Sequence, residues 1–255
     1  MPRYFIEVAY KGTNFKGFQI QLNANSIQGE INKALNTLLK TEIQTTTSSR
    51  TDAGVHALQN FLHFDTDTKL PASIIYNLNS ILHQDIVVKN LRKTHDNAHA
   101  RFDATSREYA YHIITKKNPF LKETAYYMPF KIDTDIMNEA AKILLKHKSY
   151  EAFSKRNTDV KTFECNISAS YFEINNDEII FHVASNRFLR GMVRAIVGTL
   201  LLTGRKKNTV QEFENIILSK DCTNADFSAP AHGLFLEKVN YPENIFEVLN
   251  NEKVN

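Results

Sequence analysis

The chain has 255 residues, a formal net charge of +3 and a sequence pI near 8.7. Hydrophobic residues make up 42% of it, which is enough to bury the core of one large domain or two smaller ones. A charge so close to zero excludes nucleic-acid binding by overall charge alone, so any basic surface must come from local clustering.

The cysteines and the first residues indicate where the protein works. Cys165 and Cys222 lie far apart and belong to no CxxC pair, so they cannot form a zinc site by themselves and should stay reduced. The N-terminal residues resemble a strand more than a signal peptide, and no uncharged stretch is long enough to span a membrane. We expect a soluble cytoplasmic protein without membrane contact.

The first half of the chain alternates strands and helices. Apolar and polar residues alternate over residues 4–10, which predicts a half-buried strand. An apolar stripe of helical spacing follows Asn25, the expected N-cap, and a second such helix should open at Pro71. The remaining predicted strands cover residues 42–47, 59–65 and 85–91. The order is therefore β-α-β-β-α-β.

The second half repeats this order with one extra helix. Thr209 and Glu212 form a capping box for a helix that should reach about Ser219. The other predicted elements are strands over residues 107–115, 169–174, 179–185 and 234–239, and helices over residues 135–146 and 188–203. We predict an α+β protein of two similar domains, residues 1–104 and 105–255, with a basic cleft between them.

A loop between two predicted strands carries the residues most suited to chemistry. In an extended segment Arg50 and Asp52 point to one side and Thr51 to the other, and Gly54 allows a tight turn behind them. A guanidinium beside the carboxylate favours an ionised Asp52, which can act as nucleophile or base. The alternative is a structural turn in which Arg50 only neutralises Asp52.

The predicted helix over residues 188–203 carries arginines and glycines on one face. At about 100° per residue, one narrow arc would hold Arg187, Arg190, Gly191, Arg194 and Gly198. A solvated basic face is the ordinary interpretation. However, each glycine costs roughly 1 kcal/mol in a helix interior, which favours a strip that a ligand backbone approaches closely.

Other basic residues and aromatic residues indicate RNA as the partner. Lys11 and Lys16 lie on the first loop, and Lys155 and Arg156 on a long loop over residues 153–162. The aromatic residues that could stack on a base are Phe102, Tyr109, Tyr111 and Phe153. Each alone is more typical of a core, but their combination with basic loops favours an RNA-binding surface.

No metal or nucleotide motif is convincing. His95 and His99 have i, i+4 spacing without a third ligand nearby, which favours surface histidines. His56 is more consistent with a structural hydrogen bond than with orienting Asp52 or contacting RNA. We therefore expect chemistry that depends on one aspartate, without metal or cofactor.

Residues 50–57, Arg-Thr-Asp-Ala-Gly-Val-His-Ala, resemble the signature of the tRNA pseudouridine synthase A family. Further segments resemble that family in the same order, and together they cover nearly the whole chain: residues 10–15 with Gly17 and Gln19, and residues 26–28, 99–102, 107–111, 188–194 and 229–234.

The resemblance implies a two-domain, homodimeric isomerase that converts uridine to pseudouridine in the anticodon stem-loop of tRNA, at positions 38, 39 and 40, without metal or cofactor. Asp52 would be the nucleophile and Tyr109 would stack on the uracil. Arg194 would pair with Asp52, and Leu234 would line the uracil pocket. Arg50 would hold the flipped nucleotide or fill its vacated place.

The sequence departs from the family pattern at Phe18, Ser49 and Gly191, where Trp, Gly and His are usual. These departures concern RNA contacts more than catalysis. Attack on C1′, attack on C6 and ribose deprotonation all remain open for the aspartate. Alternative functions are a non-catalytic RNA-binding or RNA-folding module of the same fold, and an enzyme that modifies other tRNA uridines.

Overall fold

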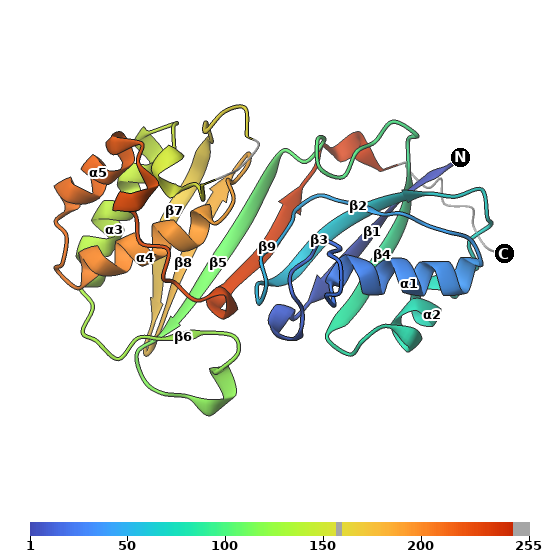
Figure 1. Ribbon diagram of the computed structural model, residues 1–255, viewed down its shortest axis with the longest axis horizontal. Helices are drawn as coiled ribbons and strands as arrows, with labels where there is room; N and C mark the ends of the chain where they lie inside the picture. Colours follow the sequence, from blue (N-terminus) through green and yellow to red (C-terminus); the bar gives the residue numbers. More distant parts are fainter. Residues whose placement is uncertain (157–159, 247–255) are drawn as a thin grey trace. The chain divides into compact units, whose positions relative to one another are not determined.

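The computed structural model describes residues 1–156 and 160–246, and it divides the chain into two compact units (Figure 1). The first contains residues 1–105 and the segment that begins at Lys238. The second runs from Ser106 to Glu237. Strand β9 (Leu234–Asn240) therefore starts in the second unit and ends in the first. The division into domains 1–104 and 105–255 stays a prediction.

The first unit contains an antiparallel sheet with β1 in its centre. Ile6 of β1 lies opposite Leu62 on one side and Leu91 on the other. Figure 1 shows its two helices next to each other beside the strands. The elements are β1 (Arg3–Tyr10), α1 (Ile27–Leu39), β2 (Thr46–Thr47), β3 (His56–Asp65), α2 (Ile74–Ile81) and β4 (Ile86–Thr94). The predicted β-α-β-β-α-β order is confirmed.

Several predicted boundaries in this unit were wrong, among them the start of β3, which is His56, and the end of β4, which is Thr94. The strand over residues 42–47 is reduced to Thr46–Thr47, because side chains of α1 bind the backbone before it: Asn36 accepts from Ile43 N at 2.6 Å. Helix α2 begins at Ile74 and not at Pro71. The N-cap of α1 is Ser26, whose hydroxyl accepts the Gly29 N–H.

The second unit repeats the order with one more helix, as predicted, and with a short strand at Tyr126–Tyr127 that was not predicted. Strand β8 pairs antiparallel with β5 on one side and β7 on the other, and Figure 1 shows the helices on one side of these strands. The predicted capping box at Thr209 is present. The elements are β5 (Ser106–Ile114), β6 (Tyr126–Tyr127), α3 (Thr134–Ile143), β7 (Ile167–Asn175), β8 (Glu178–Ser185), α4 (Met192–Gly204) and α5 (Val210–Ser219).

Helix α4 begins four residues later than predicted. Gly191 has φ +75°, a left-handed conformation that ends any helix before it, and its carbonyl accepts the first helical bond from Ala195 N at 3.0 Å. Arg187 and Arg190 therefore precede the helix, and only Arg194 lies on it. The predicted basic arc along one helix face was wrong.

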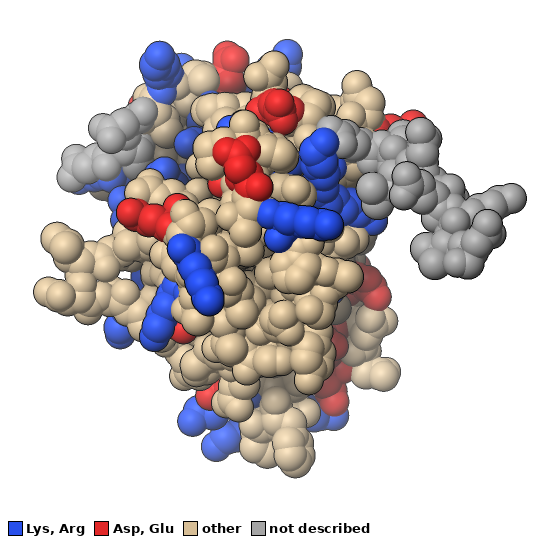
Figure 2. Space-filling view, turned by 90° about the vertical axis from the view of Figure 1, so that its right-hand side faces the viewer, with Lys and Arg blue, Asp and Glu red and all other residues tan. Residues whose placement is uncertain are grey.

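The outer surface and the helices add two observations. Figure 2 shows one face of the molecule, on which basic and acidic side chains are interspersed within a larger area of other residues. Within residues 1–156 and 160–246, no helix combines the length and the apolar character needed to cross a membrane.

Gly198 shows why α4 contains an interior glycine. A Cβ at this position would lie 2.3 Å from the carbonyl oxygen of Asp226, far inside van der Waals contact. The glycine therefore allows the segment around Asp226 to pack directly on the helix, and Asp226 N donates to Thr199 Oγ1 at 3.0 Å. Close packing explains this glycine without a ligand.

We predict that Gly198→Ala destabilises the protein by about 1 kcal/mol or more, although the same change in an unobstructed helix interior stabilises by roughly that amount. The added methyl group must displace the Asp226 carbonyl. Urea unfolding of both proteins measures the difference. A variant more stable than the parent would contradict this packing.

Candidate active site

A buried polar cluster holds the loop that precedes Asp52. Asn60 on β3 is fully buried and forms hydrogen bonds on both ends of its amide. Its Oδ1 accepts from Ser48 Oγ at 2.7 Å, and its Nδ2 donates to Ser49 O at 3.0 Å and to Tyr10 Oη at 3.2 Å. Because each buried polar group has a partner, this cluster favours a single loop conformation.

The loop presents its candidate residues in alternating directions. Thr51 is buried, as the alternation predicts, and its hydroxyl lies 2.9 Å from Tyr10 Oη. Arg50 is exposed and Asp52 is half-buried. The Asp52 carbonyl accepts from Val55 N at 3.2 Å, and Gly54 closes this turn with φ +81°. Asp52 is thus a half-buried residue on a constrained backbone.

Two glycines of the first loop allow it to pack behind the Asp52 loop. A Cβ on Gly12 would lie 2.0 Å from Val55 O, and Gly17, with φ +105°, lies against Thr51 O. The Gly12 N–H donates to His56 Nδ1 at 3.0 Å. The predicted structural hydrogen bond of His56 is confirmed.

In the second unit, side chains anchor the segment that leads to Leu234. Arg194 Nε donates to Ala229 O at 2.7 Å, and Tyr111 Oη donates to Pro230 O at 2.8 Å. Gly233 packs so closely on β5 that a Cβ would lie 2.9 Å from His112 O. These contacts bring Arg194 and the buried Leu234 to the same region of this unit.

Tyr109 lies on β5 opposite Val183. Its ring is 9% exposed and contacts Phe188 edge to face, with the ring centroids 5.0 Å apart. By strand alternation it shares a face with Tyr111, the residue that binds Pro230. The second unit thus holds Tyr109 on β5, Arg194 on α4 and Leu234 at the start of β9, directly after the anchored turn.

The predicted basic residues are distributed over both units. Lys155 N donates to Arg190 O at 3.0 Å, and the absent side chain of Gly191 leaves room for the Lys155 stem, so the backbones of these two basic residues are neighbours. Arg156 lies 4.0 Å from Asp221, which partly offsets its charge. Lys11 and Lys16 lie in the first unit, and Lys16 is exposed.

The four candidate stacking residues differ sharply in exposure. Tyr111 and Phe153 are fully buried, so both belong to the core. Phe102 is 74% exposed. His99 was expected on the surface, but it is half-buried and its Nδ1 accepts from Arg101 N at 3.1 Å. In the described parts of the chain, no three His, Cys, Asp or Glu side chains gather in a way that could hold a metal ion.

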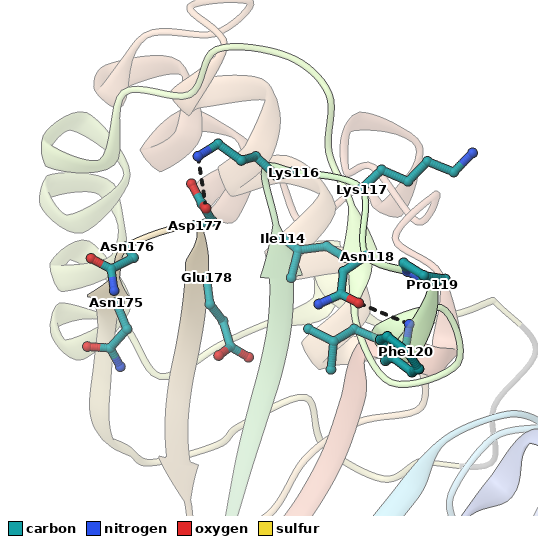
Figure 3. A pocket seen from close by; sticks show the side chains of 11 residues that line it. Ile114, Lys116, Lys117, Asn118, Pro119, Phe120, Asn175, Asn176, Asp177 and Glu178 are labelled. Atoms are coloured by element: carbon teal, nitrogen blue, oxygen red, sulfur yellow. Dashed lines mark hydrogen bonds and ion pairs between the residues drawn. The ribbon is translucent and has the colours of Figure 1, made fainter.

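Each unit contains a surface hollow among its described residues. One of about 560 Å³, at the ends of β5 and β8 in the second unit, contains the Lys116–Asp177 ion pair of 3.0 Å (Figure 3). None of the predicted site residues lines it. The other, of about 190 Å³ in the first unit, is lined by Arg50 and by the turn that carries Phe102.

Sequence reasoning missed the residues that support the candidate loop. Asn60 and Tyr10 are both buried, and the amide of Asn60 connects Tyr10 to the backbone that precedes Asp52. The available signal was an asparagine in strand alternation with the apolar Leu62 and Phe64 of β3, since a buried amide needs specific partners.

A neutral histidine holds the turn that carries Phe102. His63 Nδ1 accepts from Ala100 N at 3.1 Å. Burial first, and then the charge of Arg3 and the nearby His99, lower the pKa of His63 to about 4, against the opposing effects of Asp65 and Asp103. His63 therefore remains an acceptor over the pH range in which an exposed histidine becomes charged.

We predict that this histidine contributes to acid sensitivity. Between pH 6.5 and 4 the unfolded state binds a proton at His63 and the folded state does not, so stability decreases as pH falls, by at most about 1.4 kcal/mol per pH unit. Urea unfolding at pH 7 and pH 4.5 measures the free energy of unfolding that is lost on acidification. This loss should be smaller for His63→Gln than for the wild-type protein, because glutamine keeps an acceptor oxygen without titrating. Equal losses in the two proteins would refute this contribution.

Comparison with known proteins shows similarity along almost the whole chain. A family model described as tRNA pseudouridine synthase matches residues 6–103 and 140–242. The tRNA pseudouridine synthase A of Parabacteroides distasonis is 44% identical, with 97% of this chain and 99% of the relative covered. The proteins of the same name from Bacteroides thetaiotaomicron and Staphylococcus aureus are 45% and 35% identical, with 96% and 95% of this chain and 93% of each relative covered.

Proposed function

Because this chain belongs to the tRNA pseudouridine synthase family, whose members isomerise uridine in tRNA, we propose that Asp52 is the catalytic nucleophile of that reaction. The observation that carries the proposal is the constrained loop: buried hydrogen bonds hold the residues before Asp52, and Asp52 itself is half-buried. A preorganised carboxylate loses little conformational freedom when the substrate binds.

The chemistry needs one anionic oxygen and a site that retains the detached base. The bond between C1′ and N1 of the uridine breaks, the uracil turns, and a bond forms between C1′ and C5. A proton leaves C5 and N1 gains one, so the product is an isomer of the substrate. Asp52 can take part by attacking C1′, by attacking C6 or by removing a ribose proton. Each route requires an ionised carboxylate.

The second unit supplies the proposed uracil-binding groups. Tyr109 stacks on the target uracil, Leu234 lines its pocket, and Arg194 contributes positive charge. Arg50, on the loop of the nucleophile, holds the flipped nucleotide or fills the space it leaves. The anchoring of Arg194 to Ala229 O and the packing of Gly233 on β5 support these roles, because they hold the turn before Leu234 in place.

We further propose that the target uridines lie at positions 38, 39 and 40 of the anticodon stem-loop, that the enzyme works as a homodimer in the cytoplasm, and that neither metal nor cofactor takes part. The motif resemblance along the chain supports this substrate region. The cations that would grip the RNA backbone are Arg187, Arg190, Lys11, Lys16, Lys155 and Arg156.

The decisive experiment maps pseudouridine in an unmodified tRNA transcript after incubation with the purified protein. Wild-type protein should form it in the anticodon arm. Asp52→Asn should abolish turnover while tRNA affinity changes only a few fold, since the amide keeps the shape of the side chain without its charge. Asp67→Asn, at a side chain that is 74% exposed, is the matched control.

The other outcomes separate the alternatives. Turnover near wild type in Asp52→Asn would remove Asp52 from catalysis. Tight binding without any modification by the wild-type protein would favour a non-catalytic RNA-binding module. Pseudouridine outside the anticodon arm would preserve the chemistry and overturn the proposed substrate region.

Arg190→Ala tests the proposed backbone contact. Loss of one phosphate contact should weaken tRNA binding and reduce the slope of log K against log salt by roughly 0.7 to 0.9. Lys142→Ala, at an exposed lysine of α3 in the same unit, should leave the slope unchanged. An unchanged slope in Arg190→Ala would assign Arg190 to an ordinary solvated surface.

A further inference from the structure

The smaller hollow lies entirely in the first unit, and its charge suits an anion. Its volume of about 190 Å³ is below the roughly 300 Å³ of a pocket for a drug-sized ligand. Arg50 and Arg101 line it, both exposed, and none of its lining side chains is acidic. Gln19 and Thr46, also exposed, add polar groups. The hollow offers cations and hydrogen-bonding groups to one small polar group.

An exposed aromatic ring forms one wall of this hollow. Phe102 is 74% exposed, yet its ring packs on His99 with the centroids 4.2 Å apart and an interplanar angle of 36°. The Arg101 guanidinium carbon lies 5.7 Å from the centroid of the same ring. Burying a ring of this kind is favourable, so leaving it open costs free energy unless a ligand covers it.

Hydrogen bonds hold the turn that presents this ring. His99 Nδ1 accepts from the backbone N–H groups of Arg101, at 3.1 Å, and Phe102, at 3.3 Å. His99 N donates to Asp103 Oδ2 at 2.7 Å, and Ala100 N donates to His63 Nδ1. The ring of His63 packs on that of His99 with the centroids 4.7 Å apart. Phe102 is therefore displayed on a supported turn.

We infer that this hollow binds an unpaired nucleotide of the tRNA that adjoins the target uridine, with its base on Phe102 and its phosphate at Arg50 and Arg101. An aromatic ring beside guanidinium groups is the usual combination for unstacked RNA bases. The inference rests on the proposed function, because it places the target at Asp52, two residues from Arg50. The occupied hollow would hold the strand next to the reacting nucleotide.

The test uses anticodon-arm RNA in which 2-aminopurine replaces the nucleotide on either side of the target uridine. Stacking quenches its fluorescence, so wild-type protein should quench at least one of the two probes. Phe102→Leu should lose this quenching and raise KM for tRNA by roughly fivefold or more, the lower end of what one base stack contributes. Phe102→Tyr, which keeps an aromatic ring, should show the quenching and the KM of the wild-type protein. Arg101→Gln should reduce the salt dependence of binding by about one phosphate contact.

Matched controls separate this inference from the proposed function. Phe120→Leu removes a ring that is 92% exposed and lies outside this hollow, and it should change neither quenching nor KM. If wild-type protein forms pseudouridine but Phe102→Leu keeps normal quenching and KM, the hollow is not a nucleotide site. If no pseudouridine forms but the quenching depends on Phe102, the nucleotide site stands and the proposed function fails. Thermal unfolding checks that each variant is folded.

Discussion

The candidate active site depends on the buried amide of Asn60. It connects the start of the Asp52 loop, through Ser48 and Ser49, to Tyr10 on the neighbouring strand β1. A buried amide without partners would cost several kcal/mol, so the loop conformation that satisfies it is strongly favoured over those that do not. The polar cluster thus specifies where the backbone of residue 52 lies, while the glycines of the first loop leave room for that conformation.

In the second unit, too, hydrogen bonds from side chains hold an irregular segment of backbone in place. Tyr111 of β5 donates to the carbonyl of Pro230 and Arg194 of α4 donates to that of Ala229. Without these donors both carbonyls would lack such a partner in an irregular segment. The turn before Leu234 is therefore held by side chains and not by a ladder of backbone bonds. In each unit, irregular backbone that carries candidate residues is attached to a regular element that cannot easily move.

RNA binding by this protein has to rely on local arrangement, because the net charge is only +3 and one face shows both signs of charge interspersed (Figure 2). The backbone hydrogen bond that brings the basic residues Lys155 and Arg190 together is one such arrangement. The cationic hollow with the exposed Phe102 is another. This hollow places cations beside an aromatic ring, which suits a folded RNA with unpaired bases better than a uniform duplex backbone.

The sequence by itself determined the order of the elements, the loop position of Asp52 and the family, because alternation, helical spacing and short motifs depend on residues close together in the chain. Predictions from the sequence failed for features that depend on residues far apart in the chain. The start of α4 depends on the left-handed Gly191 beside Lys155, and the shortened β2 depends on side chains of α1. The role of Asn60 and the exposure of Phe102 also come from the tertiary structure, because burial and hydrogen-bond partners are set by packing between segments far apart in sequence.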